Sequence, residues 1–136
     1  MPDVPWSTPT RPEPAAEVYV MASRFETAGL LGALRFFLRT PGIILQVRKA
    51  PGANGVALRA RVFSRTFLTL SAWEDREALY RFARSEPHRS TSRAASAFTK
   101  ESVFTFWSVP AAELPISWAE AERRLAEQRH RQRTTG

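Results

Sequence analysis

The sequence offers one side chain that is well placed to move a proton near neutral pH. His88 is one of two histidines in the 136 residues, and it follows Pro87, which ends or kinks a helix predicted over residues 75–85. A helix break can direct a side chain into a cavity, and a histidine has an unperturbed pKa of about 6.5. One interpretation is a general base or a hydrogen-bond anchor for a phenolic or enolic substrate. The other is an imidazole that caps carbonyl oxygens at a helix terminus.

Aromatic and polar side chains elsewhere in the chain are candidates for a pocket around His88. Aromatic rings give ligand pockets a rigid apolar surface, although core packing is their commoner use. Gln46 stands in an apolar run, so it is either a polar group of a pocket or an outward-facing strand residue. Arg89 could orient an anionic group, although exposed arginines are commoner on solvated faces. The predicted substrate-binding residues are Trp73, Phe82, Arg89, Phe98, Phe104, Trp107 and Gln46.

The composition excludes several kinds of site. The chain has no cysteine, which removes disulfides, zinc–thiolate sites, iron–sulfur clusters and a thiol nucleophile. There is no loop with clustered Asp and Asn at calcium spacing, and we expect no metal. Phosphate-loop, dinucleotide and serine-elbow motifs are also missing. One axial histidine is chemically sufficient for haem, so haem at His88 is the alternative to a site without a cofactor.

The net charge is +7, from 20 basic and 13 acidic residues. Such a balance is found in nucleic-acid-binding proteins, but a high-GC genome produces the same arginine bias. The arginines are scattered, with local density only in residues 123–133, and no segment resembles the central-strand signature of RNA-recognition domains. We therefore expect no nucleic-acid partner.

No apolar run reaches the roughly 18–20 residues that span a bilayer. The longest, residues 29–38, is interrupted by Arg35. The N-terminus lacks the basic patch and apolar core of a secretory signal. These features are typical of a cytoplasmic bacterial protein with no membrane partner.

Hydrophobic periodicity predicts alternating strands and helices. Thr40-Pro41-Gly42 is predicted to end the first helix, and Ser117 with Glu120 forms a capping box for the last. Residues 56–65 alternate apolar and basic side chains, which suits either an edge strand or an irregular insertion. Residues 88–98 are predicted as a short further helix. The other predicted strands are 17–25, 43–48, 66–73 and 103–109, and the helices are 27–39, 75–85 and 117–128.

The chain divides into three parts. Residues 1–16 contain five prolines and are predicted to be disordered or irregular, with Trp6 as the residue able to anchor them. Residues 17–127 form one α+β domain. Residues 128–136 are predicted to be a frayed basic tail.

The element order is β-α-β-β-α-β with an extra C-terminal helix, which is the ferredoxin-like pattern with an antiparallel sheet. Residues 67–70 and 103–107 are apolar in both phases of the pleat, whereas a sheet with one solvated face should alternate. By this prediction too little chain is left over to cover a second face by itself. A homodimer through the open sheet face, in a dimeric α+β barrel, is the economical explanation.

Three groups of segments together resemble a known set of proteins. They are TLSAWED at 69–75 followed by Ala78, Leu79 and Phe82; PHR at 87–89; and FW at 106–107 with VP at 109–110, LP at 114–115 and the helix over 120–125. With these segments the chain resembles the dimeric α+β barrel superfamily, and within it the antibiotic-biosynthesis-monooxygenase-like and spheroidene-monooxygenase-like proteins. The resemblance covers residues 17–125.

The resemblance implies a monooxygenase-like oxidoreductase of secondary metabolism that needs no cofactor. Its substrate would be apolar, of an aromatic or polyketide/terpenoid type, and its deprotonation by His88 would make it electron-rich enough to react with oxygen. The superfamily also includes haem enzymes, isomerases and cyclases, and fold does not fix function. The alternative is a non-catalytic ligand-binding or structural homodimer. Residues 52–64 are an extra stretch relative to these proteins, which would reshape any pocket.

Overall fold

The computed structural model describes residues 3–61, 64–85, 88–89, 93 and 99–135. The described residues contain a five-stranded sheet in which every neighbouring pair is antiparallel, in the order β1-β3-β4-β2-β5. The strands are β1 (Asp3–Ser7), β2 (Glu17–Thr27), β3 (Ala53–Arg61), β4 (Thr66–Trp73) and β5 (Thr99–Pro110).

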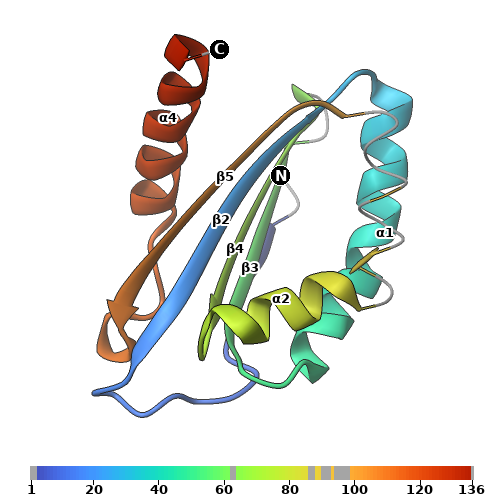
Figure 1. Ribbon diagram of the computed structural model, residues 1–136. Helices are drawn as coiled ribbons and strands as arrows, with labels where there is room; N and C mark the ends of the chain where they lie inside the picture. The colour runs from blue at the N-terminus through green and yellow to red at the C-terminus, as the bar shows by residue number, and fades with distance from the viewer. Residues whose placement is uncertain (1–2, 62–63, 86–87, 90–92, 94–98, 136) are drawn as a thin grey trace.

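Helices cover both faces of the sheet (Figure 1). Two of them pack on one face, and the C-terminal helix packs on the other. The order β2-α1-β3-β4-α2-β5 confirms the ferredoxin-like α+β prediction, with β1 and the last helix as additions. The helices are α1 (Leu30–Lys49), α2 (Arg76–Arg84), the short 3-10 turn η2 (Ala111–Glu113) and α4 (Trp118–Thr135).

Local end signals place α2 and α4 where the sequence predicts them. The Asp75 carboxylate accepts a hydrogen bond from the backbone N–H of Ala78 at 2.8 Å, and the Ser117 hydroxyl accepts one from Glu120 at 3.1 Å. Each bond satisfies a backbone donor that has no partner inside the helix.

The predicted strand over residues 43–48 is wrong, because α1 runs through Pro41 without ending. A proline cannot donate to the carbonyl four residues earlier, which here belongs to Phe37. The Thr40 hydroxyl donates to that carbonyl instead, at 2.7 Å, so the oxygen keeps a partner. Ile43, Ile44 and Val47 then pack at helical spacing against the core. Tertiary packing overrides the strand preference of these β-branched residues.

The stretch 52–64, predicted as an insertion, mostly forms the second strand of the ferredoxin-like order. β3 pairs with β4 in a register that places Val56 opposite Ser71 and Leu58 opposite Thr69. Gly52 makes the preceding turn with a φ of 82°, a conformation that glycine adopts readily. Because β3 lies between β1 and β4, it is an interior strand, which explains why most of it is buried.

The predicted disordered arm also contributes structure, since Asp3–Ser7 forms the edge strand β1. An edge strand tolerates Pro5, which lacks a donor for the sheet. Trp6 packs against the core and lies directly over Gly55, where a larger residue has no room: an added Cβ at Gly55 would come within 1.9 Å of the Trp6 ring. Gly55 therefore provides the seat for Trp6.

Substituting Gly55 with alanine is expected to displace Trp6 and destabilise the protein by about 1–3 kcal/mol, because overpacking forces a strand to move. Urea denaturation measures the loss, and hydrogen exchange should show that the amides of β1 lose protection first. Gly29→Ala is the matched control, since an added Cβ there meets no atom within 4 Å. Its effect should stay within about 0.5 kcal/mol. Equal effects of the two substitutions would contradict the claim that Gly55 makes room for the Trp6 ring.

Residues 128–136 were predicted to fray, but α4 continues to Thr135. Glu101 on β5 holds this part of the helix, because it pairs with Arg129 at 2.6 Å and with Arg133 at 3.7 Å. Nearer the start of the same helix, Ala121 and Leu125 are buried against the sheet. The premise that too little chain remains to cover the second sheet face is therefore wrong, because α4 covers it. The homodimer itself stays a prediction.

Candidate functional site

A cavity of about 570 Å³ lies between the sheet and the helices α1 and α2. The strand register places alternate residues of β2, β4 and β5 on this face, so the cavity floor is built from every second side chain. We call it the sheet–helix cavity. Its described lining residues are Met21, Ser23, Phe25, Thr40, Ile43, Ile44, Val47, Val56, Ala57, Leu58, Thr69, Leu70, Ser71, Trp73, Leu79, Tyr80, Phe82, Ala83, His88, Thr99, Ser102, Phe104 and Phe106.

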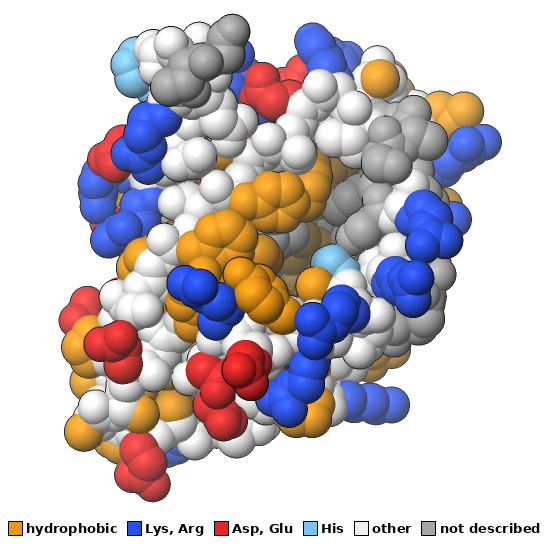
Figure 2. Space-filling model, in the orientation of Figure 1, with side chains coloured by type: hydrophobic (Ala, Val, Ile, Leu, Met, Phe, Trp, Pro, Cys, Tyr) orange, Lys and Arg blue, Asp and Glu red, His pale blue; other side chains and the backbone are white. Residues whose placement is uncertain are grey.

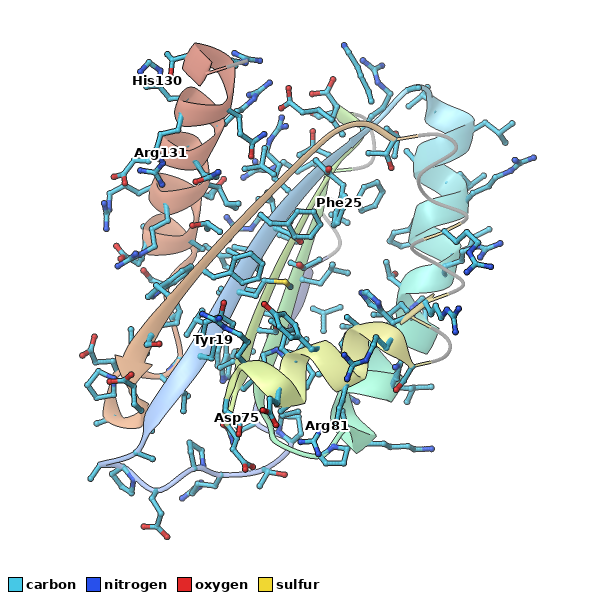
Figure 3. All side chains as sticks on the ribbon, in the orientation of Figure 1. Tyr19, Phe25, Asp75, Arg81, His130 and Arg131 are labelled. Atoms are coloured by element: carbon cyan, nitrogen blue, oxygen red, sulfur yellow. The ribbon has the colours of Figure 1, made fainter. Side chains whose placement is uncertain are left out.

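Aromatic rings form much of the cavity wall. Trp73 and Phe82 lie with ring centroids 5.0 Å apart, and Phe25 meets Phe104 edge-on at 5.4 Å. Figure 2 shows hydrophobic side chains gathered around a hollow on this face, with a histidine at its edge. In Figure 3, the Phe25 side chain points from β2 toward α1. An apolar cavity of this size suits an apolar or aromatic small molecule.

Hydroxyl groups give the cavity floor a polar strip that our sequence-based prediction of site residues missed. The hydroxyls of Ser23 and Thr69 hydrogen-bond to each other across β2 and β4. Ser71 accepts a hydrogen bond from the Trp73 indole N–H at 2.9 Å. The signal was present, because Thr69 and Ser71 share the phase of Trp73 in a strand whose side chains alternate with a period of two.

His88 lines the cavity beside Phe82, whose ring centroid is 4.8 Å away. Its Nδ1 lies 3.1 Å from the carbonyl oxygen of Ala83, near the end of α2. A carbonyl can only accept, so Nδ1 carries the proton of the neutral ring and Nε2 carries the basic lone pair. This is the tautomer that a general base acting through Nε2 requires.

Gln46 holds His88 in place from outside the cavity. Its Oε1 accepts a hydrogen bond from the backbone N–H of His88 at 2.7 Å, and its Nε2 donates to the carbonyl of Phe82 at 3.2 Å. Because residue 46 lies in α1, the predicted role of an outward-facing strand residue is wrong, and the cleft that Gln46 lines is the one between α1 and α2. The side chain is a bridge from α1 to the end of α2, and it is not among the residues that line the sheet–helix cavity.

Burial lowers the pKa of the His88 imidazole below its ordinary value, and the hydrogen bond to Ala83 opposes this only in part. The folded protein therefore binds fewer protons at His88 than the unfolded chain, so its stability should fall as pH decreases below about 6.5. His88→Asn should lack this loss. Urea midpoints of both proteins between about pH 8 and pH 5 check it: the wild type should lose stability relative to the variant on acidification. Parallel curves would contradict the assignment.

The structure brings only some of the remaining predicted residues together. Trp73, Phe82 and Phe104 come together with His88 in the sheet–helix cavity. Trp107 lies on the opposite face of the sheet, under the Arg124 guanidinium at 4.4 Å, since it occupies the other phase of β5. Arg89 is exposed and lines none of the described cavities, while Phe98 lies outside the described residues, as does most of the helix predicted over 88–98.

The other histidine is not part of this site. His130 lies on α4, on the far side of the sheet, as Figure 3 shows. It borders a second cleft of about 480 Å³ with Arg24, Arg61 and Glu122. These two arginines already form ion pairs with carboxylates. Glu122 pairs with Arg61 at 3.2 Å, and Glu101 pairs with Arg24 at 3.3 Å. The sheet–helix cavity is therefore the better candidate for a site that handles an apolar molecule.

Haem fits the sheet–helix cavity poorly. His88 could supply an axial nitrogen, but the two propionates of haem would need cationic partners. The described lining of the cavity includes neither arginine nor lysine. Within the part of the chain that the structure describes, no group of three or more His, Asp or Glu side chains is arranged to hold a metal ion.

Several solved structures share this fold. A variant of SnoaB, a cofactor-independent oxygenase from Streptomyces nogalater, is 20% identical with a TM-score of 0.57, covering 75% of this chain and 100% of SnoaB. A Nitrosomonas europaea protein, provisionally described as an antibiotic-biosynthesis monooxygenase, is 12% identical with a TM-score of 0.63, covering 74% and 94%. PA3566 from Pseudomonas aeruginosa is 20% identical with a TM-score of 0.57, covering 71% and 96%. These likenesses confirm the predicted resemblance at the level of fold.

Sequence comparison identifies a family for the chain but no individual curated relative. No curated protein matches the chain. One family model matches residues 35–135 of the 136, a range that includes most of α1, every strand from β3 to β5, and α4. By that match, the chain belongs to the family described as a domain of unknown function, DUF3291.

Proposed function

We propose that the protein is a monooxygenase-like enzyme that oxidises an apolar aromatic or polyketide/terpenoid-type molecule in the sheet–helix cavity, without a cofactor. The observation that supports this most is the position of His88 in a mostly apolar cavity, with a tautomer in which Nε2 is the basic nitrogen. The description of SnoaB as a cofactor-independent oxygenase agrees with it.

In the proposed reaction, Nε2 of His88 removes the hydroxyl proton of a phenolic substrate. Electron density moves to a ring carbon, which transfers one electron to O₂, and the two radicals combine to form a C–O bond. His88 returns its proton to the peroxide oxygen. Loss of water then breaks the O–O bond, and the ring carbon loses its hydrogen and becomes a carbonyl. Phenol and O₂ thus give a quinone and water, and O₂ is the only oxidant needed.

The hydroxyls of the cavity floor and the bridge from Gln46 have supporting roles. Ser23, Thr69 and Ser71 offer hydrogen bonds to substrate oxygens, which would orient the ring toward His88. The hydrogen bonds of Gln46 with Phe82, Ser85 and His88 restrain the end of α2, which carries the carbonyl partner of His88. The substrate would need little polar recognition beyond this strip.

The second candidate function is ligand binding without catalysis. It is favoured by the same Nδ1 contact, because an imidazole near a helix end also serves to satisfy a carbonyl oxygen. Under either function we propose that the protein is cytoplasmic and forms a homodimer. Sedimentation velocity on the purified protein tests the oligomeric state directly.

The decisive experiment measures O₂ uptake with naphthol and its dihydroxy analogues, alongside binding of the same compounds under nitrogen. We expect uptake with a quinone product, and Ser102→Phe should lower kcat/KM roughly 10- to 100-fold because its ring fills the cavity. Ser108→Phe is the matched control: Ser108 lies on the same face of the same strand and is likewise exposed, but it does not line the cavity.

Three results would decide against the proposal. Binding without oxygen uptake would establish the non-catalytic function. Uptake that Ser102→Phe and Ser108→Phe reduce equally would move the reaction away from the sheet–helix cavity. A preparation with a Soret absorption band that titrates with activity would require haem.

A further inference from the structure

Five leucines on α1 are exposed at the surface of the protein. We call them the leucine stripe, and each is roughly half exposed or more. Their exposed fractions are 55% for Leu30, 63% for Leu31, 48% for Leu34, 68% for Leu38 and 54% for Leu45. An isolated exposed leucine needs no explanation, but a contiguous apolar surface of this kind usually contacts something.

The stripe is a second apolar face of α1, separate from the one that packs on the sheet. At 3.6 residues per turn, the five leucines fall within one arc of about 100°. Ala33, Phe37 and Val47 lie on a different arc and pack into the core clusters beneath the helix. Neither the core nor the sheet–helix cavity uses the leucine stripe.

The charged residues of α1 itself are all basic. The sequence of α1 has no Asp or Glu, and Arg35 and Arg39 are exposed along one border of the stripe. Near its C-terminal end, Lys49 shares a surface cleft with Leu45 and with Arg81 and Arg84 of α2. Figure 2 shows Lys and Arg side chains lining this edge of the molecule. The helix therefore combines a leucine surface with a basic border.

We propose that the leucine stripe docks α1 parallel to an anionic lipid surface, with the leucines in the headgroup–acyl boundary and the arginines on lipid phosphates. This combination of apolar and basic faces is typical of helices that lie in a membrane interface. A second copy of the chain is a poorer occupant, because two such helices would bring basic borders together with no acidic residue in either.

Docking differs from spanning. Among the described residues, α1 is long and apolar enough to cross a membrane by length and composition alone. Crossing would require it to leave the sheet, whereas docking keeps Ala33, Phe37 and Val47 packed. The expectation from sequence of no membrane partner rested on the lack of an uninterrupted apolar run that could span a bilayer and of a secretory signal, and neither criterion tests whether a helix docks along the surface. The inference goes beyond the proposed oxygenation and does not depend on it.

The test is co-sedimentation of the full chain with phosphatidylcholine vesicles, with and without phosphatidylglycerol. We expect binding to the anionic vesicles that weakens with added salt. Arg35→Gln with Arg39→Gln should reduce affinity by about tenfold or more, since each basic residue near an anionic surface contributes. Leu34→Ser with Leu38→Ser should reduce it at least as much. Arg11→Gln with Arg131→Gln removes the same charge from exposed positions elsewhere and should change affinity little.

Other outcomes overturn the inference. These are wild-type binding to neither vesicle, equal binding to both, or equal losses in the two arginine pairs. Another result is that the wild type does not bind vesicles and sediments as a dimer, while Leu34→Ser with Leu38→Ser sediments as a monomer. In that case the leucine stripe is a contact between two copies of the chain. Circular dichroism melts of each variant verify that the fold is intact, which is expected because the substituted side chains are exposed.

Discussion

Replacing His88 with asparagine is expected to lower turnover of a phenolic substrate by about 10²- to 10⁴-fold, the usual contribution of a positioned general base. The asparagine amide can occupy the place of Nδ1 and donate to the Ala83 carbonyl, so the end of α2 keeps its hydrogen bond. Only the basic Nε2 is removed. Because the structural contact survives, loss of turnover reports chemistry and not a fold defect.

Initial rates of oxygen uptake measure this effect, and the pH profile distinguishes the two roles of the residue. In the wild type, kcat/KM should rise with pH through the lowered pKa of His88, and the rise should be missing in His88→Asn. His88→Ala removes both the base and the hydrogen bond, and should lose stability in addition. Turnover that stays at the wild-type level in His88→Asn would remove His88 from the mechanism.

Replacing Trp73 with alanine is expected to destabilise the protein by about 3–5 kcal/mol, as for other large buried aromatic residues. Trp73 is fully buried at the end of β4, contacts Phe82, and donates its indole N–H to Ser71. Its removal enlarges the sheet–helix cavity and takes packing from α2, which carries the neighbours of His88. Urea denaturation followed by circular dichroism measures the change.

Two comparisons make the Trp73 result interpretable. Trp73→Phe keeps a ring against Phe82 and should lose much less stability than Trp73→Ala. Trp107→Ala removes the same kind of side chain from the other face, where it is only partly buried, and should also lose less. If Trp107→Ala proves the more damaging, the packing described around Trp73 does not anchor α2.

The elements that the sequence predicts well are those whose ends have chemical markers. Helix α2 begins after the capping Asp75, and β4 runs from Thr66 to Trp73 as predicted. The predicted end of the first helix was wrong. The Thr40 side chain donates the hydrogen bond that Pro41 cannot donate, and a pattern of residue types does not reveal this contact. That error moved the second strand and turned most of β3 into an apparent insertion.

Of the residues predicted for the candidate site, His88, Trp73, Phe82 and Phe104 line one cavity, and the others that the structure describes do not. Local sequence singled out His88 through the helix break before it. Trp107 was predicted as a substrate-binding residue but lies on the α4 side of the sheet, because β5 is apolar in both phases and its residues give no sign of which phase faces which helix. Which phase faces which helix depends on the packing of α4 against Val103 and Val109, a contact that the local sequence of β5 does not reveal.

The proline inside α1 changes what keeps that helix continuous at its middle. With no backbone donor at Pro41, the side chain of Thr40 supplies the bond to the Phe37 carbonyl, and that hydroxyl can rotate away as a peptide N–H cannot. Ala33 and Phe37 before this point, and Ile44 and Val47 after it, pack both halves of the helix against the core. At Pro41 the helix therefore depends on its buried face more than on its backbone hydrogen bonds.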